Sequence, residues 1–337
     1  LGRVNTGSVA QRLADTPGVA RTILGAARAA RGMPGADPRA MSHSWLFTGP
    51  PGSGRSLAAI DFAAALMCTD PEEPGCGRCE ACRAVLETKQ HTDLVLVDPQ
   101  EVIIPVDTVR EVIGRAASLP TVAPWRVVIF NNADRLNNNG ANALLKTVEE
   151  PPARTVIIMC APSDAPEDFS QTLRSRCRHL YIPSPSVESI TAQLVSEGAS
   201  DHDAHLAALT SLRHVGRARR LVNDPAVQKR RAVAINLAEE VFHGSQGFQA
   251  VTSLLKLVDS EAKESHKEQE EAELAKLEQT LGVGAKGKGA AKAQRDARSA
   301  IKELQDQHKK RAKRRVIDNL DLVLVDLSGV YRDALIQ

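Results

Sequence analysis

The sequence predicts an α/β fold, in which a parallel sheet carries helices on both faces and is followed by helical regions. Two observations lead to this prediction. Short apolar runs alternate with amphipathic stretches such as 56–67 and 140–150, a pattern typical of parallel strands joined by helices. Beyond residue 187 the strand signals stop and helical periodicity continues alone. The apolar runs, which we expect to form buried strands, lie at 44–48, 93–97, 126–130, 155–160 and 179–183.

The composition narrows the class of protein. The chain has 337 residues and a formal net charge of +2, so its overall charge gives no reason to expect a nucleic-acid partner. No apolar run reaches the ~18 residues that a membrane helix needs, and the first residues lack a secretory signal pattern. We therefore expect a cytoplasmic protein whose cysteines stay reduced and, where they cluster, bind metal.

A glycine-rich stretch, GPPGSGRS, joins the first expected strand to the helical pattern that follows it. Phosphate-binding loops of the form G-x-x-x-x-G-K-[ST] occur in this strand–loop–helix setting. Glycines let backbone N–H groups turn toward an anion, and the helix that follows adds the positive end of its dipole. We therefore expect a nucleotide-binding loop made of Gly49, Pro50, Pro51, Gly52, Ser53, Gly54, Arg55 and Ser56.

The loop departs from a working ATPase in two ways. Arg55 replaces the usual lysine, and its wide planar guanidinium is a poor substitute for a compact ammonium between phosphates. After the strand at 126–130, Asn131 and Asn132 stand where an ATPase carries the acidic residues that hold Mg²⁺ and polarise water. We predict a degenerate site that can hold ATP or ADP but does not hydrolyse it, and we expect Asp134 to cap a helix or form a salt bridge.

Four cysteines follow the helix after the loop with the spacing C-x7-C-x2-C-x2-C. Four thiolates this close, with glycine and proline between them, can close a tetrahedral Zn²⁺ site. Because protein ligands fill all four positions, the zinc would be structural and not catalytic. An iron–sulfur cluster is the competing metal assignment, although nothing else in the chain indicates redox chemistry. The expected ligands are Cys68, Cys76, Cys79 and Cys82.

Two further motifs, NALLKTVEEPP at 142–152 and SRC at 175–177, carry a resemblance to a known family. Together with the cysteine module after the loop, they resemble the clamp-loader branch of the AAA+ superfamily, in particular the clamp-loader subunits of bacterial DNA polymerase III. The motor subunits (gamma/tau) of that family carry lysine in the loop and an acidic pair after the third strand. With Arg55 and Asn131 at these positions, the chain is similar to the stator class, which lacks ATPase activity.

The resemblance implies a role in a hetero-pentamer with motor subunits (gamma/tau) and a delta subunit, which opens a sliding clamp and places it on primed DNA. In this family the arginine of the SRC motif reaches the ATP of a neighbouring subunit, which assigns Arg176 as an arginine finger in trans. Arg219 matches the position of a second sensing arginine that faces the chain's own nucleotide.

The resemblance also sets the expected domains. We predict an AAA+ nucleotide-binding-like domain at 1–183 with the zinc module at 68–82, a small α-helical lid at 184–226 and an α-helical collar domain at 227–337. Within the collar, the charged segment 262–315 reads as a solvated helical hairpin with a mobile basic tip. The last helix ends without a capping signal, so we expect the native chain to continue beyond Gln337.

Two other functions remain open from the sequence alone. In the first, the chain is an active motor-type ATPase of the gamma/tau kind, with Arg55 in the role of lysine. In the second, the cysteine module is a zinc ribbon that binds nucleic acid, although it lacks interleaved aromatic residues and an excess of basic residues.

Overall fold

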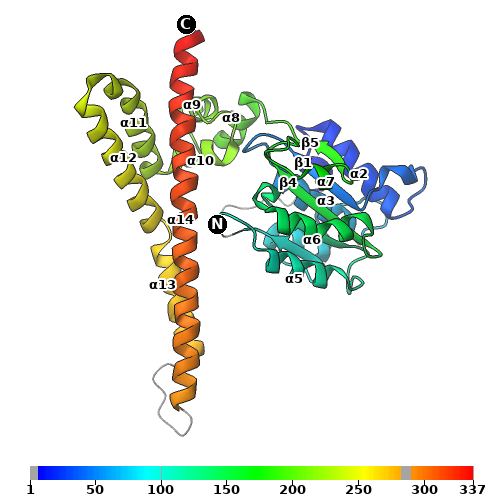
Figure 1. Ribbon diagram of the computed structural model, residues 1–337. Helices are drawn as coiled ribbons and strands as arrows, with labels where there is room; N and C mark the ends of the chain where they lie inside the picture. The colour runs from blue at the N-terminus through cyan, green and yellow to red at the C-terminus, as the bar shows by residue number, and fades with distance from the viewer. Residues whose placement is uncertain (1–6, 100, 282–289, 337) are drawn as a thin grey trace. The chain divides into compact units, whose positions relative to one another are not determined.

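The computed structural model describes residues 7–99, 101–281 and 290–336. The chain divides into two compact units, Leu1–Arg219 and Arg220–Gln337, which are considered separately below (Figure 1). No helix that the structure describes has both the length and the apolar character needed to cross a membrane.

A parallel sheet of five strands in the order β2-β3-β4-β1-β5 forms the centre of the first unit. All five strands expected from the apolar runs are confirmed, and every paired neighbour runs parallel, with Leu46 opposite both Met159 and His179. Because the strands are parallel, their carboxyl ends meet at one edge of the sheet, where the loop after β1 lies. The strands are β1 (Ser44–Thr48), β2 (Leu94–Val97), β3 (Arg126–Phe130), β4 (Thr155–Ala161) and β5 (Arg178–Tyr181).

One expectation about these strands is wrong, because β5 is not buried. Arg178 and Tyr181 are exposed and the two residues between them are only half-buried, whereas every residue of β1, β3 and β4 is buried. β5 is an edge strand that pairs only with β1, and unlike the apolar β2 at the other edge it consists mainly of polar side chains that remain at the surface.

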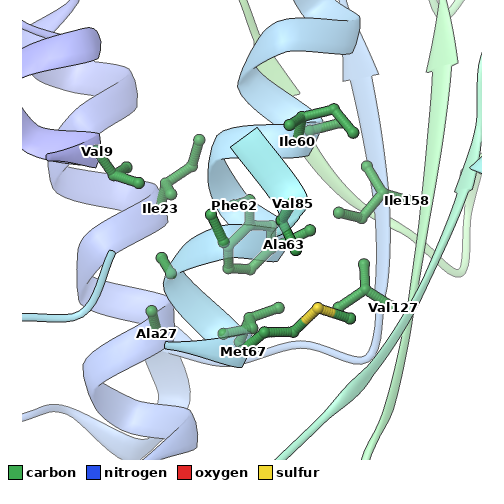
Figure 2. Packing of buried hydrophobic residues seen from close by; sticks show 14 of the residues in the cluster. Val9, Ile23, Ala27, Ile60, Phe62, Ala63, Met67, Val85, Val127 and Ile158 are labelled. Carbon is green, nitrogen blue, oxygen red and sulfur yellow. The ribbon is translucent and has the colours of Figure 1, made fainter. Parts of the chain in front are cut away.

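Helices cover both faces of the sheet, as the sequence predicts. Successive residues of β1 point to opposite faces, so Trp45 and Phe47 join one hydrophobic cluster and Leu46 joins the other. The first face carries α2 and α3, and Figure 2 shows Phe62 of α3 between Ile23 of α2 and the strand residue Ile158. The helices concerned are α2 (Pro17–Ala30), α3 (Arg55–Met67), α5 (Val106–Ala116), α6 (Asn138–Glu149) and α7 (Gln171–Arg174).

A buried carboxylate at the start of β2 ties three segments of the first unit together. Asp93 is fully buried and accepts hydrogen bonds from the N–H groups of Thr121, Val122 and Ala123. It also pairs with the buried Arg126 at 2.9 Å. Burial alone would raise the pKa of Asp93, but these donors outweigh it and hold the pKa at about 2.

We expect Asp93→Asn to lower the free energy of unfolding by about 3–5 kcal/mol at pH 7, because it leaves Arg126 as a buried, unpaired charge. The stabilisation by Asp93 is present above the unfolded pKa of about 4 and is lost as the pH falls toward the folded pKa. Urea unfolding of both proteins at several pH values measures this, and the difference between them should shrink between about pH 4 and pH 2. A difference that is constant with pH would contradict the ionised role of Asp93.

Three helices close the first unit after β5. Ser186 and Ser200 cap α8 and α9 by accepting from N–H groups three residues on, as serine does at helix starts. The helices are α8 (Val187–Ser196), α9 (Asp201–Thr210) and α10 (Val215–Asn223). They lie in the segment expected to form the lid. The predicted domain boundaries at 183 and 226 stay predictions, and α10 runs across the division between the two units.

The second unit is entirely helical in the residues that the structure describes. Its core holds Leu254 and Val258 of α12 against Leu237 of α11 and Val323 of α14. Two ion pairs also join these helices, Arg230 with Glu261 and Arg231 with Asp326, and each has one buried member, Arg230 and Asp326. The helices are α11 (Pro225–Glu240), α12 (Ser245–Glu264), α13 (Lys267–Thr280) and α14 (Ala290–Ile336).

The expected helical hairpin within the second unit is present as α13 and α14, which pack against each other (Figure 1). The predicted basic tip lies largely at 282–289, outside the described residues. The remaining short elements of the chain are α1 (Val9–Arg12), η1 (Pro38–Ala40), α4 (Glu80–Arg83), η2 (Ala84–Thr88), η3 (Ala133–Arg135) and η4 (Val241–His243).

Candidate nucleotide loop, metal centre and interface arginine

The glycine-rich loop runs from the end of β1 to the start of α3, as the sequence predicts. Gly52 and Gly54 have φ values of 85° and 89°, in the left-handed region that favours glycine. The N–H of Gly49 donates to the carbonyl of Pro162 at 3.2 Å, which fixes the loop beside the end of β4. Gly54 is the N-cap of α3, so free backbone N–H groups of the first helical turn face the loop.

The side chain of Arg55 turns back onto this loop. Its Nη1 donates to the carbonyl oxygen of Gly49, the first residue of the loop. Burial lowers the pKa of Arg55, while the nearby Cys160, Asp134 and Asp168 act in the opposite direction. The guanidinium stays charged, but its donor is used within the protein instead of reaching outward as an extended lysine would.

The end of β3 lacks the acidic pair of an ATPase. Asn132 adopts a left-handed conformation with φ of 51°, which asparagine tolerates better than most residues. Asp134 neither caps η3 nor forms an ion pair with the described residues, so the expected structural role is wrong. Its burial raises its pKa, and this favours the protonated carboxyl.

Three buried polar atoms close to the loop have no hydrogen-bond partner among the described residues: Ser53 Oγ, Asn131 Oδ1 and Asp134 Oδ1. Buried polar atoms without partners are uncommon and mark places where a water molecule or ligand completes the bonding. These three atoms could therefore still form hydrogen bonds with a ligand or a water molecule at the loop, although the loop lacks the groups for hydrolysis.

A histidine that sequence reasoning missed lies against the loop. A Cβ atom added to Gly52 would lie 2.3 Å from Cγ of His214, so the imidazole packs directly on the glycine backbone. His214 precedes α10, and its Nδ1 accepts from the N–H of Arg217 at 3.2 Å. Only a glycine fits here, both for this close approach and for its positive φ. His214 stands two residues before the basic stretch GRARR at 216–220. Its contact with Gly52 could not be predicted from the sequence, because the two residues are far apart in the chain.

The proposed sensing arginine lies in the same helical region. Arg219 donates through Nε to Glu197 at 2.6 Å, and its Nη2 binds the other carboxylate oxygen. This bidentate pair raises the pKa of Arg219 through hydrogen bonding to Glu197. A nucleotide would have to displace Glu197 to engage Arg219, so its assignment as a nucleotide ligand stays a prediction.

The four cysteines meet in one cluster. The Sγ atoms of Cys68, Cys76, Cys79 and Cys82 all lie within 4.8 Å of one another. The Sγ atoms of Cys68 and Cys79 are 3.9 Å apart. Four sulfurs at about 2.3 Å from one tetrahedral ion would be about 3.8 Å apart, so the cluster has the dimensions of a single-ion site. A cluster of several iron ions would need the sulfurs further apart.

The surroundings of the cysteines also suit a metal dication. The N–H groups of Cys79 and Cys82 each donate to the sulfur three residues earlier, at 3.4 Å. Hydrogen bonding from Cys82 lowers the pKa of Cys68, and the same hydrogen bond raises the pKa of Cys82, because the donated proton stabilises the thiolate of Cys68 and is held on Cys82. A bound dication would take the place of this proton and let all four thiols ionise.

Contacts join the cysteine module to the rest of the first unit. The carbonyl of Gly75 accepts from the N–H of Val9 at 2.8 Å, and Arg31, the residue after α2, donates to the carbonyl of Asp70. The two other cysteines stand apart from this cluster. Burial raises the pKa of Cys160 and of Cys177 to about 12, so both are unreactive thiols.

The arginine of the SRC motif lies on the surface after α7. Its Nε is bound by the carboxylate of Glu149, at the end of α6, and its Nη1 donates to the carbonyl of Thr172 at 2.8 Å and to Ser175 Oγ at 3.1 Å. The side chain of Arg176 is 36% exposed. Among the described residues, none forms a hydrogen bond with Nη2, so this part of the guanidinium remains available.

The two arginines beside Arg176, Arg174 and Arg178, make contacts within the chain. Arg174 pairs with Asp164 at 2.9 Å. Arg178 donates to the carbonyl of Ala40 at 2.6 Å, and its guanidinium lies 5.0 Å from the centre of the Trp45 ring. Arg176 and Arg178 are both exposed, and each keeps guanidinium nitrogens that form no hydrogen bond with a described residue, so the assignment of Arg176 rests on its place in the SRC motif.

These features define a class of protein: a phosphate-loop α/β module with a four-cysteine cluster and an exposed arginine after β4. Residues 36–186 match the profile of the family described as "DNA polymerase III, delta subunit". Over this region the chain is similar to clamp-loader subunits of DNA polymerase III.

The curated relatives support this assignment. The chain is 35% identical to the DNA polymerase III subunit delta′ of Pseudomonas aeruginosa over 47% of this chain and 49% of that protein. It is 34% identical to the delta′ subunit of Escherichia coli over 50% of each. It is also 33% identical to the gamma/tau subunit of Mycobacterium tuberculosis, over 50% of this chain and 30% of that protein. The chain spans about half the length of the delta′ subunits that it matches.

Among solved structures, the chain is similar to a DNA polymerase III gamma subunit-related protein of Thermotoga maritima. The match covers 86% of this chain and 95% of that one, at 16% identity and a TM-score of 0.35.

Proposed function

We propose that the protein is a non-catalytic stator of a DNA polymerase III clamp loader, of the delta′ type. In this role it helps to load the sliding clamp on primed DNA and supplies Arg176 to the ATP of a neighbouring subunit. Its partners would be the motor subunits (gamma/tau), a delta subunit, the clamp and DNA, at the replisome in the cytoplasm. The cysteine cluster would hold one structural Zn²⁺.

The observation that carries the stator role is the state of the nucleotide loop. Arg55 binds the carbonyl of Gly49, and asparagines stand where acidic residues would hold Mg²⁺. ATP hydrolysis depends on electrostatic stabilisation of the phosphate charge. This site lacks both the compact lysine cation and the acidic metal ligand that would provide it. The backbone geometry of the loop is kept, so ATP or ADP can bind without being hydrolysed.

Arg176 supports the second part of the proposal. Its guanidinium is held from one side by Glu149 and Thr172, which limits its freedom and leaves Nη2 available for an incoming phosphate. An arginine oriented in advance loses less entropy when it binds a phosphate oxygen.

The alternative is an active motor subunit of the gamma/tau kind. The 33% identity to a mycobacterial gamma/tau subunit supports this alternative. In that case Arg55 would have to leave Gly49 and take the place of lysine between phosphates. The loss of the acidic residues after β3 favours the stator, since a change at Arg55 alone would not restore a metal ligand.

We expect the isolated chain to hydrolyse ATP at less than about 0.01 s⁻¹, well below the 1 s⁻¹ at the lower end of common enzyme rates. A coupled assay of phosphate release measures this rate in the absence of other subunits. Any residual rate should be the same in the Arg55→Ala variant. Such a rate does not depend on the loop and would come from a contaminating ATPase. Turnover above about 1 s⁻¹ that Arg55→Ala abolishes would establish the motor alternative instead.

A further inference from the structure

The hairpin of α13 and α14 separates charges of opposite sign onto its two helices. The helix α13 carries five glutamates and two lysines. On α14, residues 297–315 include eight lysines and arginines but only two acidic residues. Surfaces that serve solubility mix the two signs, so this separation calls for another explanation.

Part of the positive charge on α14 is used within the hairpin. Glu273 of α13 accepts from His308 at 3.0 Å and from Arg311 at 2.8 Å, and Glu270 pairs with Arg315 at 2.7 Å. The side chains of His308, Arg311 and Arg315 are at most 27% exposed. One face of α14 is therefore neutralised by α13.

The opposite face of α14 carries an exposed row of cations, which we call the basic stripe. At about 100° per residue its members fall within a sector of about 120°, and at 1.5 Å per residue they span about 22 Å. The one acidic residue in this sector is Asp306, whose pKa is lowered by a hydrogen bond from Lys309 and by the charges of Lys302 and Lys310. The basic stripe consists of Arg298, Lys302, Lys309, Lys310 and Lys313, all exposed.

We propose that the basic stripe binds the phosphate backbone of double-stranded DNA without reading its sequence. A straight row of cations about 22 Å long can neutralise several phosphates of a stiff polyanion at once. Residues 297–330 contain no Phe, Tyr or Trp, so the helix offers no surface on which the bases of a single strand could stack. The stripe also contains no apolar residue that could anchor a protein partner.

The inference depends only on the second unit and is independent of the role of Arg176. Nothing in the nucleotide loop or the cysteine cluster enters it. A negative result for Arg176 would therefore not count against DNA binding by the basic stripe. A negative result for the basic stripe would likewise not count against the role of Arg176.

The test is the fluorescence anisotropy of a labelled 30-base-pair duplex titrated with the full chain at several salt concentrations. The variant K302Q/K309Q/K310Q/K313Q removes four cations of the stripe and keeps side-chain length and helix propensity. The matched control, K229Q/K256Q/K263Q/K276Q, removes four exposed lysines elsewhere in the same unit and changes the net charge equally. Circular dichroism of both variants should match that of the unchanged chain.

We expect the stripe variant to bind the duplex at least tenfold more weakly at about 50 mM salt. The slope of its binding constant against salt concentration, on logarithmic axes, should fall by the amount expected for the loss of up to about four phosphate contacts. The control should change affinity by less than about twofold, since surface charge distant from the contact acts weakly. Equal losses in both variants, or no loss in either, would overturn the proposal. Equal competition by a single strand would overturn the assignment to duplex DNA, and equal competition by polyglutamate would overturn the assignment to nucleic acid.

Discussion

Replacing Arg176 by alanine should slow ATP hydrolysis at one site of the assembled clamp loader by about a thousandfold or more, the usual effect of an arginine finger. The positive charge of this residue would stabilise phosphate charge that develops during the reaction, so its loss raises the barrier without weakening the subunit's own fold. Rapid-quench measurement of a single turnover should show one ATP per complex removed from the fast phase. Gel filtration should show the complex still assembled, because Arg176 makes only surface contacts in the free chain.

Two controls make this experiment specific. Arg174→Ala removes a neighbouring arginine that is already paired with Asp164, and it should leave the fast phase intact. Arg176→Lys keeps the charge but not the planar fork, and its rate should lie between those of the alanine variant and the unchanged protein. If Arg174→Ala and Arg176→Ala reduce the fast phase equally, Arg176 has no special role. If neither does, the finger assignment is wrong.

The second large effect concerns the cysteine cluster. Metal analysis should find about one zinc per chain, and exhaustive chelation should lower the melting temperature by about 10 °C or more, because binding to a structural zinc site contributes directly to folding. The loss should spread beyond the module, since Gly75 and Asp70 bind α1 and the residue after α2 through their carbonyl groups.

Substitutions separate the metal from a general loss of stability. The double variant C76S/C79S removes two expected ligands and should bind no zinc. Cys160→Ser changes a buried cysteine outside the cluster, so it can destabilise the sheet while the zinc content stays at one. A chain that contains no zinc as purified, or one that keeps it in C76S/C79S, would contradict the assignment.

Local patterns were enough to predict most of the first unit. Each expected strand is a short apolar run, and its conformation depends on residues within that run. The burial of β5 could not be predicted in this way, because it depends on the order of the strands, and the order arises from pairings between distant segments. The hairpin was predicted from composition. The neutralised face and the basic face of α14 could be distinguished only from the contact between Glu273 and Arg311, which joins two helices.

The candidate site shows the same division. The loop and the cysteines were predicted because their spacing in the sequence sets their chemistry. The contact of His214 with Gly52 and the bond between Glu149 and Arg176 each join segments far apart in the chain. Asp134 was assigned a structural partner from its charge alone, and only the fold shows that its Oδ1 is buried without a hydrogen-bond partner among the described residues.

The ion pairs of the second unit limit how its helices can move. Adjacent arginines on α11 reach two different helices, Arg230 to Glu261 on α12 and Arg231 to Asp326 on α14. Sliding either partner helix by one turn, about 5.4 Å, would break its ion pair and leave the buried Arg230 or the buried Asp326 without its partner. The three helices therefore resist slippage, and a mechanical load on one of them is passed to the others as the displacement of a single rigid body.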